Sequence, residues 1–437
     1  MGVMHLLATP SPWDSAGLWI VATGAAANMA CATVGSLLVL RRMSMMGDAI
    51  SHAVLPGLAA AFLWSGSYQP GPLLAGAAVA GLAAALLTQT LHQFVRVPAD
   101  ASMGIVFTTL FAVGVVLVRS MQGVHFDVQC VYEGALEFAP LSMVDLGWFH
   151  APRALVSTTV ALLANLAVLC GLWKEWKISS FDPQLATALG FSAARLHYLL
   201  MAMVAATAVA CFEAVGSILV VAMFIVPAST AHLLTDRLAP MVLVACLLGA
   251  ASAAGGYAVA HASENAGVSL SVAGLMTVVA GGLFAMAALF GPRYGVVVSV
   301  VHALRTHMRI AQEDLLALMY RAEELPAPRT LGVDEACRAL GAGWLARRAV
   351  RRLVGAARIE RAGDRLALTP AGRATARQLV RGHRLWEAYL VEHVGLAADH
   401  VHEGADRVEH FLDEQFQRRL EQRLDDVRRD PHGKPIP

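Results

Sequence analysis

An aspartate and a histidine stand four positions apart in the apolar stretch MSMMGDAISHAVLPG, residues 43–57. If this stretch is helical, Asp48 and His52 lie on one face of the helix, on adjacent turns. A carboxylate and an imidazole in that arrangement offer two ligands to a divalent metal. Two interpretations fit: a metal site, or an Asp–His pair that only fixes helix packing or lies at a membrane interface. The Pro56-Gly57 pair that follows is expected to end or kink the helix, as in the broken helices that line transport cavities.

A second set of candidate ligands lies near the end of the sequence. It occupies two segments with helical spacing, HRLWEAYL (383–390) and VHEGADRVEH (401–410), and consists of His383, Glu387, His402, Asp406, Glu409 and His410. All of these residues offer nitrogen or oxygen donors, which suit Mn²⁺ or Fe²⁺ better than a thiolate-favouring metal, and Zn²⁺ would also bind. The other interpretation is an ordinary pair of charged helices.

A basic segment precedes this second set. Residues 333–372 read as a helix, a turn, a second helix and a two-stranded wing. Four arginines fall on one side of the second helix: Arg347, Arg348, Arg351 and Arg352. Such a face suits DNA phosphates and guanine edges. A solvated charged face and contact with anionic lipid are the alternatives, and composition alone does not choose among them.

The chain that must position these residues is strongly apolar. Of its 437 residues, 57% are hydrophobic and 15% are charged, and the mean hydropathy is +0.57. Soluble domains carry about 25% charged residues, so much of the chain does not face water. About nine runs have the length and composition of membrane spans: residues 18–40, 49–65, 72–95, 103–119, 152–173, 197–214, 216–235, 240–261 and 269–290. After about residue 301 the charge density becomes that of a soluble domain, which predicts a domain boundary.

Positive charges predict the topology of these spans. They follow every second run, from the first to the ninth: Arg41, Arg42, Arg96, Lys174, Lys177, Arg237 and Arg293. This bias places the N-terminus outside a bacterial plasma (inner) membrane and the C-terminal domain in the cytoplasm. No basic region and cleavage site typical of a signal peptide precede the first run, so we expect it to be retained as a span.

The loop after the fifth run, KISSFDPQLATALGFSAARL (177–196), carries the signals of a short helix. Asp182 is expected to be its N-cap, Pro183 its first helical residue and Gly190 its stop. A short amphipathic helix on the cytoplasmic side of a membrane protein is a candidate docking surface for a soluble partner.

The first 290 or so residues resemble the permeases of ATP-binding-cassette importers for manganese, zinc and iron. The resemblance rests on MSMMGDAISHAVLPG, on GSILVVAMFIVPASTAHLLT (216–235) and on FDPQLATALG (181–190), and VPADASMGIVF (97–107) and GLFAMAALFGPRYG (282–295) also fit. It implies that Asp48 and His52 contact the metal in transit. It also assigns coupling to an ATPase to Phe181, Asp182, Pro183, Ala186 and Gly190. His232 departs from the family, which usually has arginine or a similar residue there.

The same resemblance implies several partners. They are a separate ABC ATPase subunit, an extracytoplasmic metal-binding protein and a second permease chain, identical or different. The chain has no G-x-x-x-x-G-K-[ST] loop, so we expect a permease subunit that does not hydrolyse ATP and is not an enzyme.

Residues 309–437 resemble the diphtheria-toxin-repressor family, metal-dependent winged-helix proteins that dimerise through the helices carrying their metal sites. By position, the resemblance implies these metal ligands: Asp314, His383, Glu387, His402, Asp406, Glu409 and His410. His402 corresponds to a ligand of iron-responsive members, and Asp406 stands where relatives have Cys or Glu. Ala317 stands where manganese-responsive members have a carboxylate. The second helix of the winged-helix segment lacks the family's usual Ser/Thr-containing pattern, so the resemblance implies no particular DNA sequence.

Together these observations predict an all-α polytopic membrane bundle resembling type II ABC importer permeases, followed by a cytoplasmic winged-helix and helical metal-binding domain. The expected boundaries are 1–298 for the permease, 299–308 for a linker, 309–372 for the winged helix and 373–437 for metal binding and dimerisation. We expect an importer of Mn²⁺, Fe²⁺ or Zn²⁺ whose tail senses the metal and regulates transport. The alternatives are a tail that is a DNA-binding repressor, tethered or released by proteolysis, and a tail that is only a dimerisation scaffold.

Overall fold

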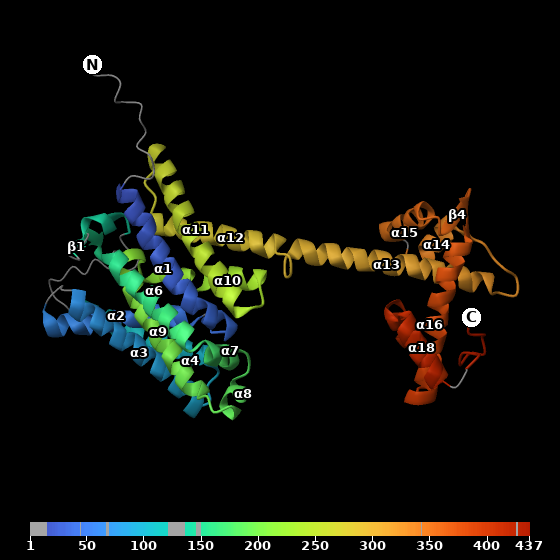
Figure 1. Ribbon diagram of the computed structural model, residues 1–437, viewed down its shortest axis with the longest axis horizontal. Helices are drawn as coiled ribbons and strands as arrows, with labels where there is room; N and C mark the ends of the chain where they lie inside the picture. Colours follow the sequence, from blue (N-terminus) through green and yellow to red (C-terminus); the bar gives the residue numbers. More distant parts are fainter. Residues whose placement is uncertain are drawn as a thin grey trace, which may run out of the picture. The chain divides into compact units, whose positions relative to one another are not determined.

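The computed structural model describes residues 15–43, 45–66, 70–120, 136–145, 150–341, 343–424 and 427–437. The chain divides into two compact units, the first ending at Val298 and the second beginning at Ser299. Figure 1 colours the chain along its sequence and labels most of the helices and some of the strands of both units.

The first unit is a bundle of apolar helices. Among the described residues, eight helices are long and apolar enough to cross a membrane, and a ninth apolar helix is shorter. These helices are α1 (Ser15–Leu40), α2 (Met46–Ser65), α3 (Pro70–Phe94), α4 (Ala99–Ser120), α6 (Arg153–Gly171), α9 (Ala193–Val215), α10 (Ser217–Leu234), α11 (Leu238–Asn265) and α12 (Val272–Phe290). The prediction of a multi-pass helical bundle is confirmed.

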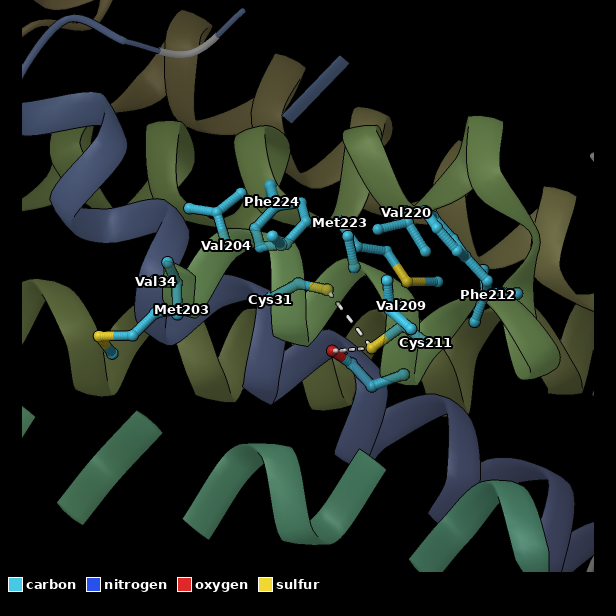
Figure 2. Close-up of a cluster of buried hydrophobic side chains, with 14 of the residues drawn as sticks. Cys31, Val34, Met203, Val204, Val209, Cys211, Phe212, Val220, Met223 and Phe224 are labelled. Carbon is cyan, nitrogen blue, oxygen red and sulfur yellow. Dashed lines mark hydrogen bonds between the residues drawn. The ribbon is translucent and has the colours of Figure 1, made fainter. Parts of the chain in front are cut away.

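Helix α1 lies at the centre of this bundle, packed against α6, α9, α10 and α11. Figure 2 shows its Cys31 and Val34 among buried side chains of α9 and α10, with the Cys31 and Cys211 sulfurs 3.8 Å apart. A Cβ added at Gly35 would lie 1.9 Å from the Phe224 carbonyl oxygen. Glycine is therefore what lets α1 approach α10 so closely, as small residues do between membrane helices.

Helix α2 packs against α3 and α4 around Pro56 and Gly57. A Cβ added at Gly57 would lie 2.2 Å from the Gly76 carbonyl oxygen, and one at Gly114 would lie 2.8 Å from the Pro56 nitrogen. The helix continues through this pair to Ser65, so of the two predicted effects of Pro56-Gly57 the helix end is wrong, and the kink stays a prediction. Close packing of two neighbouring helices offsets the hydrogen bond that proline removes, and the pair marks a helix crossing instead.

Short elements connect the spans. On the path from α4 to α6 these are η1 (Leu136–Leu141) and the antiparallel strands β1 (Met143–Asp145) and β2 (His150–Pro152). Helices α7 (Trp173–Phe181) and α8 (Pro183–Ala188) lie between α6 and α9.

The second unit begins with a winged-helix arrangement. Its elements are α13 (Val296–Glu323, which starts just before the unit boundary), β3 (Leu331–Gly332), α14 (Val333–Ala339), α15 (Trp344–Gly355), β4 (Ile359–Ala362) and β5 (Arg365–Leu368). The strands form an antiparallel sheet in the order β3-β5-β4, with Ile359 opposite Leu368. A core that includes Leu315, Val350 and Ile359 joins α13 and α15 to this wing. Residues 299–308, expected as a linker, lie within α13.

The remaining elements are α16 (Pro370–Val394), η2 (Ala398–His400), α17 (His402–Val408), η3 (Glu409–Phe411) and α18 (Glu414–Arg423). Thr369 caps α16 by accepting a hydrogen bond from the Gly372 N–H at 3.0 Å. Helix α16 packs against α17, η3 and α18, which brings the two candidate ligand segments together. The prediction of a winged helix followed by a helical domain is confirmed.

Candidate metal sites

Asp48 and His52 lie on one face of α2, one turn apart. Their nearest side-chain atoms, Asp48 Oδ1 and His52 Nε2, are 3.4 Å apart, and the side chains are 38% and 30% exposed. The His52 ring stacks on Phe107 and meets the edge of Phe111, both on α4. The pair is therefore partly open, held on one side by aromatic rings, and offers two ligands that a passing cation could reach.

Helix α8 has the capping that its sequence predicts. The Asp182 carboxylate accepts hydrogen bonds from the Gln184 and Leu185 N–H groups at 3.0 and 2.9 Å, and Pro183 opens the helix. Gly190 follows with φ +88°, a conformation that glycine adopts without strain. Ala186 is buried. Exposed apolar side chains surround it on α7, on α8 and just beyond: Phe181, Leu185 and Leu189.

In the second unit, His383, Glu387 and His402 form what we call the first trio. His383 Nε2 lies 3.1 Å from Glu387 Oε1 and 3.1 Å from His402 Nδ1, and the remaining side of the triangle is 2.9 Å. Helix α16 contributes His383 and Glu387, both almost fully buried, and α17 contributes the half-exposed His402. Three lone-pair atoms thus converge on one point.

Two further groups lie beside the first trio. The second trio is Asp314, Glu409 and His410, and the third trio is His383, Asp406 and Glu409. His410 Nε2 lies 3.1 Å from Asp314 Oδ1, and His383 Nδ1 lies 2.5 Å from Glu409 Oε2. A neutral imidazole has one acceptor nitrogen. A metal bound to His383 Nε2 therefore leaves the Nδ1–H to donate to Glu409, and the first and third trios cannot both use this histidine.

Hydrogen bonds set the protonation of the three buried groups. Burial opposes charge on His410, but hydrogen bonds to Asp314 and Glu313 raise its pKa to about 10. Burial likewise opposes charge on His383, yet hydrogen bonds to Glu387 and Glu409 raise its pKa. Burial would raise the pKa of Glu387, but hydrogen bonds from His383 and His402 lower it to about 2. Without metal, protonation of His383 and His410 is therefore favoured, and a cation that binds these rings must displace protons.

The donor set fits a divalent transition metal. Within each trio the candidate ligand atoms lie within 4.8 Å of one another, and all are imidazole nitrogens or carboxylate oxygens. Such donors suit Mn²⁺, Fe²⁺ and Zn²⁺. Each of the seven predicted sensor residues belongs to at least one of the three trios. That they bind a metal remains a prediction.

Three residues near the trios went unnoticed in the sequence. Glu313 Oε2 lies 2.8 Å from His410 Nδ1, so it orients that ring from the side opposite Asp314. His432 Nε2 lies 3.9 Å from Glu387 Oε1. Arg321 Nη2 lies 3.6 Å from Glu409 Oε2. Spacing alone could have placed Arg321 two turns after Asp314 on one helix face, whereas nothing local points to His432.

The four arginines of α15 are all exposed, while Ala346, Ala349, Val350 and Leu353 face the core. They form two stripes. Arg348 and Arg352 line a groove together with the exposed Trp344 and with residues of α13 that include Val301 and Leu304. Arg347 and Arg351, each one residue before an arginine of the first stripe, form the other stripe. The basic face expected from the sequence is therefore present, and half of it borders an apolar helix surface.

Comparisons with known protein families match the two units of the chain separately. The family model described as "ABC 3 transport family" matches residues 17–291, and the model described as "Iron dependent repressor, metal binding and dimerisation domain" matches residues 369–437.

Individual relatives are membrane transport proteins. The manganese transport system membrane protein MntD of Bacillus subtilis is 42% identical over 289 residues, which are 65% of this chain and 96% of the relative. The zinc transport system membrane protein TroD of Treponema pallidum is 36% identical over 359 residues, 81% of this chain and 96% of the relative. The solved structure of PsaBC from Streptococcus pneumoniae in complex with Fab matches 64% of this chain and 94% of its own, with a TM-score of 0.54 and 27% identity.

Proposed function

Because this chain belongs to the ABC 3 transport family, as its match over residues 17–291 shows, we propose that it is the membrane permease subunit of an ATP-driven importer of a divalent transition metal. The names of its relatives support manganese, zinc or iron as the cargo. The tail carries a metal-binding domain of the iron-dependent repressor family, and we propose that it senses the imported metal and regulates transport.

Asp48 and His52 are the residues proposed to contact the cargo. Ionisable side chains within membrane helices are costly and usually mark a transport path. Two ligands in a partly open setting can hold a cation briefly without retaining it, because firm binding needs more donors. The pair lies on α2, one of the apolar helices, which packs against α3, α4, α9 and α10, and this supports a membrane-embedded route.

The partners proposed for this subunit follow from the family. An ABC ATPase would dock on α8, where Phe181, Leu185 and Leu189 expose apolar surface around a capped helix. An extracytoplasmic metal-binding protein would deliver the cargo, and a second permease chain would complete the path. The positive charges that follow alternate spans support a cytoplasmic location for both α8 and the tail.

One observation carries the regulatory role of the tail. Helix α13 contributes Asp314 to the second trio, and its first residue, Val296, follows the end of α12 at Phe290 by a short turn. A metal bound by this trio would join α13 to η3, so its binding acts on the helix that continues from the last membrane span. For regulation, the metal must bind two states of this arrangement with different affinity.

Uptake tests this proposal. Cells that express the chain with its ATPase and binding protein are expected to accumulate Mn²⁺, Fe²⁺ or Zn²⁺, measured by mass spectrometry of the metals, only while ATP is available. In a chain with His402→Ala and His410→Ala, uptake should continue at internal metal levels that stop the unchanged chain. His400→Ala, which removes an exposed histidine outside the trios, is the matched control. Equal shut-off in all three chains would show that the tail does not regulate transport.

A second candidate function rests on the exposed arginines of α15 within a winged helix. In this alternative, the tail represses transcription when metal is bound. The full chain in detergent, titrated with Mn²⁺, would then bind DNA from upstream of its own gene selectively and at raised salt. Salt-sensitive binding without sequence preference would reject a repressor, because phosphate contacts alone give that pattern.

A further inference from the structure

Arg321 brings a positive charge to the edge of the second trio. Its Nη2 atom is buried and has no hydrogen-bond partner among the residues that the structure describes, although the side chain as a whole is 31% exposed. This atom lies 3.6 Å from Glu409 Oε2, a distance too long for a hydrogen bond. Arg321 also lines a cavity of about 730 Å³ that Asp314, Asp406, Glu409 and His410 share.

Helix α13 therefore presents two opposite groups to this cavity. Asp314 lies 3.1 Å from His410 Nε2 and attracts a cation, whereas Arg321, two turns later, repels one. Between them stands Ala317, buried and with no polar side-chain atom. A guanidinium stays charged at any pH the protein meets, so loss of a proton does not remove this repulsion.

We propose that Arg321 is the residue that sets the metal affinity of the second trio, by competing with the ion for Glu409. The proposal rests on the metal-binding function proposed above. Without metal, Arg321 offsets part of the negative charge of the clustered carboxylates. When an ion binds, Glu409 must coordinate it. The positive charge of Arg321, a few ångströms away in a buried setting, then repels the bound cation.

Such a residue suits a sensor that limits import. A tail that responded to traces of metal would stop transport before the cell was supplied. A built-in competing cation raises the metal concentration at which the second trio fills. Arg321 and Asp314 both lie on α13, the helix that follows the last span. A metal bound by the second trio would therefore also change the charge interactions that this helix makes.

The test measures metal affinity in the purified full chain, in a background of Asp48→Ala, His402→Ala and Asp406→Ala that weakens the other candidate sites. Mn²⁺ is titrated against a chelating dye. Arg321→Gln is expected to tighten binding on the order of tenfold, while Arg321→Lys, which keeps the charge, should stay near the unchanged chain. Arg373→Gln removes an exposed ion pair with Glu323 in the same unit and is the matched control.

A second readout separates an electrostatic role from a merely structural one. Arg321→Gln should lower the thermal stability of the metal-free tail, because unbalanced carboxylates remain, and should enlarge the stabilisation that Mn²⁺ brings. A structural role would lower stability equally with and without metal. Unchanged affinity in Arg321→Gln, or equal affinity gains in the Gln and Lys variants, would overturn the role of Arg321 alone. No Mn²⁺ binding in any variant would overturn the proposed sensor as well.

Discussion

The two units offer cations two different settings. In the first unit, Asp48 and His52 face each other at 3.4 Å, and about a third of each side chain is exposed. In the second unit, His383, Glu387 and Glu409 are almost fully buried, and three helices direct donors toward them. A site on a path must release its ion, whereas a sensor must hold one long enough to respond. A small number of solvent-exposed ligands favours release of the ion, and a larger number of preorganised, buried ligands favours its retention.

The surroundings of the ligands differ in the same sense. His52 is flanked by the aromatic rings of Phe107 and Phe111, which restrict its ring without fixing a tautomer. His410, in contrast, has Glu313 at one nitrogen and Asp314 at the other. Carboxylates that orient a histidine commonly strengthen a metal site. We therefore expect substitutions to separate the two sites cleanly.

The largest expected effect is on transport. Asp48→Ala should reduce metal uptake by at least about tenfold, because loss of a residue that only supports a metal ligand already has an effect of that size. Mn²⁺ binding by the tail should stay unchanged. Uptake and equilibrium binding are measured on the same preparation. Asp399→Ala, which removes an exposed aspartate paired with His400, is the control. Normal uptake by Asp48→Ala would remove this pair from the path.

The next effect is on the tail. His383→Ala should weaken Mn²⁺ binding by about ten- to a hundredfold, because this ring is a candidate ligand of the first and of the third trio, whichever of the two holds the ion. Isothermal titration of the full chain measures it, with His400→Ala as the matched histidine control. His383→Ala should leave the proposed transport residues of the first unit unaffected, so the initial rate of uptake at low internal metal should stay normal. A change in initial uptake would mean that the two units do not act separately.

A smaller effect is the pH dependence of the metal-free tail. The pKa of His410 is raised from 6.5 to about 10, so its stabilising contribution is complete below pH 6.5 and is lost as the pH rises through 10. The pKa of Glu387 is lowered from 4.5 to about 2, so its contribution is complete above pH 4.5 and is lost as the pH falls through 2.

Hydrogen–deuterium exchange of residues 402–411, corrected for the intrinsic rate at each pH, measures this dependence. Protection should fall between pH 6.5 and 10 in the unchanged chain and become flatter in His410→Gln. Over the same range, Mn²⁺ affinity should rise, because fewer protons compete for the histidines. Protection that rose with pH would contradict the ion pairs around His410.

The smallest effect concerns α8. Asp182→Ala removes the acceptor of two N–H groups and should destabilise this short helix by about 1 kcal/mol. Transport-coupled ATP hydrolysis is expected to decrease without being lost, since the apolar contact surface remains. Ser271→Ala, which removes the N-cap of α12, is the matched control. An equal decrease in both variants would show general destabilisation of the bundle rather than weakened coupling.

Much of the fold follows from local sequence. The apolar runs predict the spans because length and hydropathy decide what crosses a bilayer. The capping of α8 follows from Asp182 and Pro183 because these interactions join neighbours in the chain. In the tail, the four-residue spacing of His383 and Glu387 places them on one helix face for the same reason. Local preference could not show that α2 continues past Pro56, because the close approach of α3 and α4 decides that.

Only the tertiary structure determines how the candidate ligands meet. His383 and Glu409 are 26 residues apart and share a 2.5 Å contact, and His410 meets Glu313 across 97 residues. Spacing along one helix says nothing about which helices pack together, nor about which ring nitrogen faces which carboxylate. Sequence by itself therefore determined the residue types and their helix faces. Packing of α13, α16, α17 and η3 decided that the third trio shares His383 with the first and Glu409 with the second. It also decided that Arg321 stands beside them, because such contacts depend on the relative placement of distant elements.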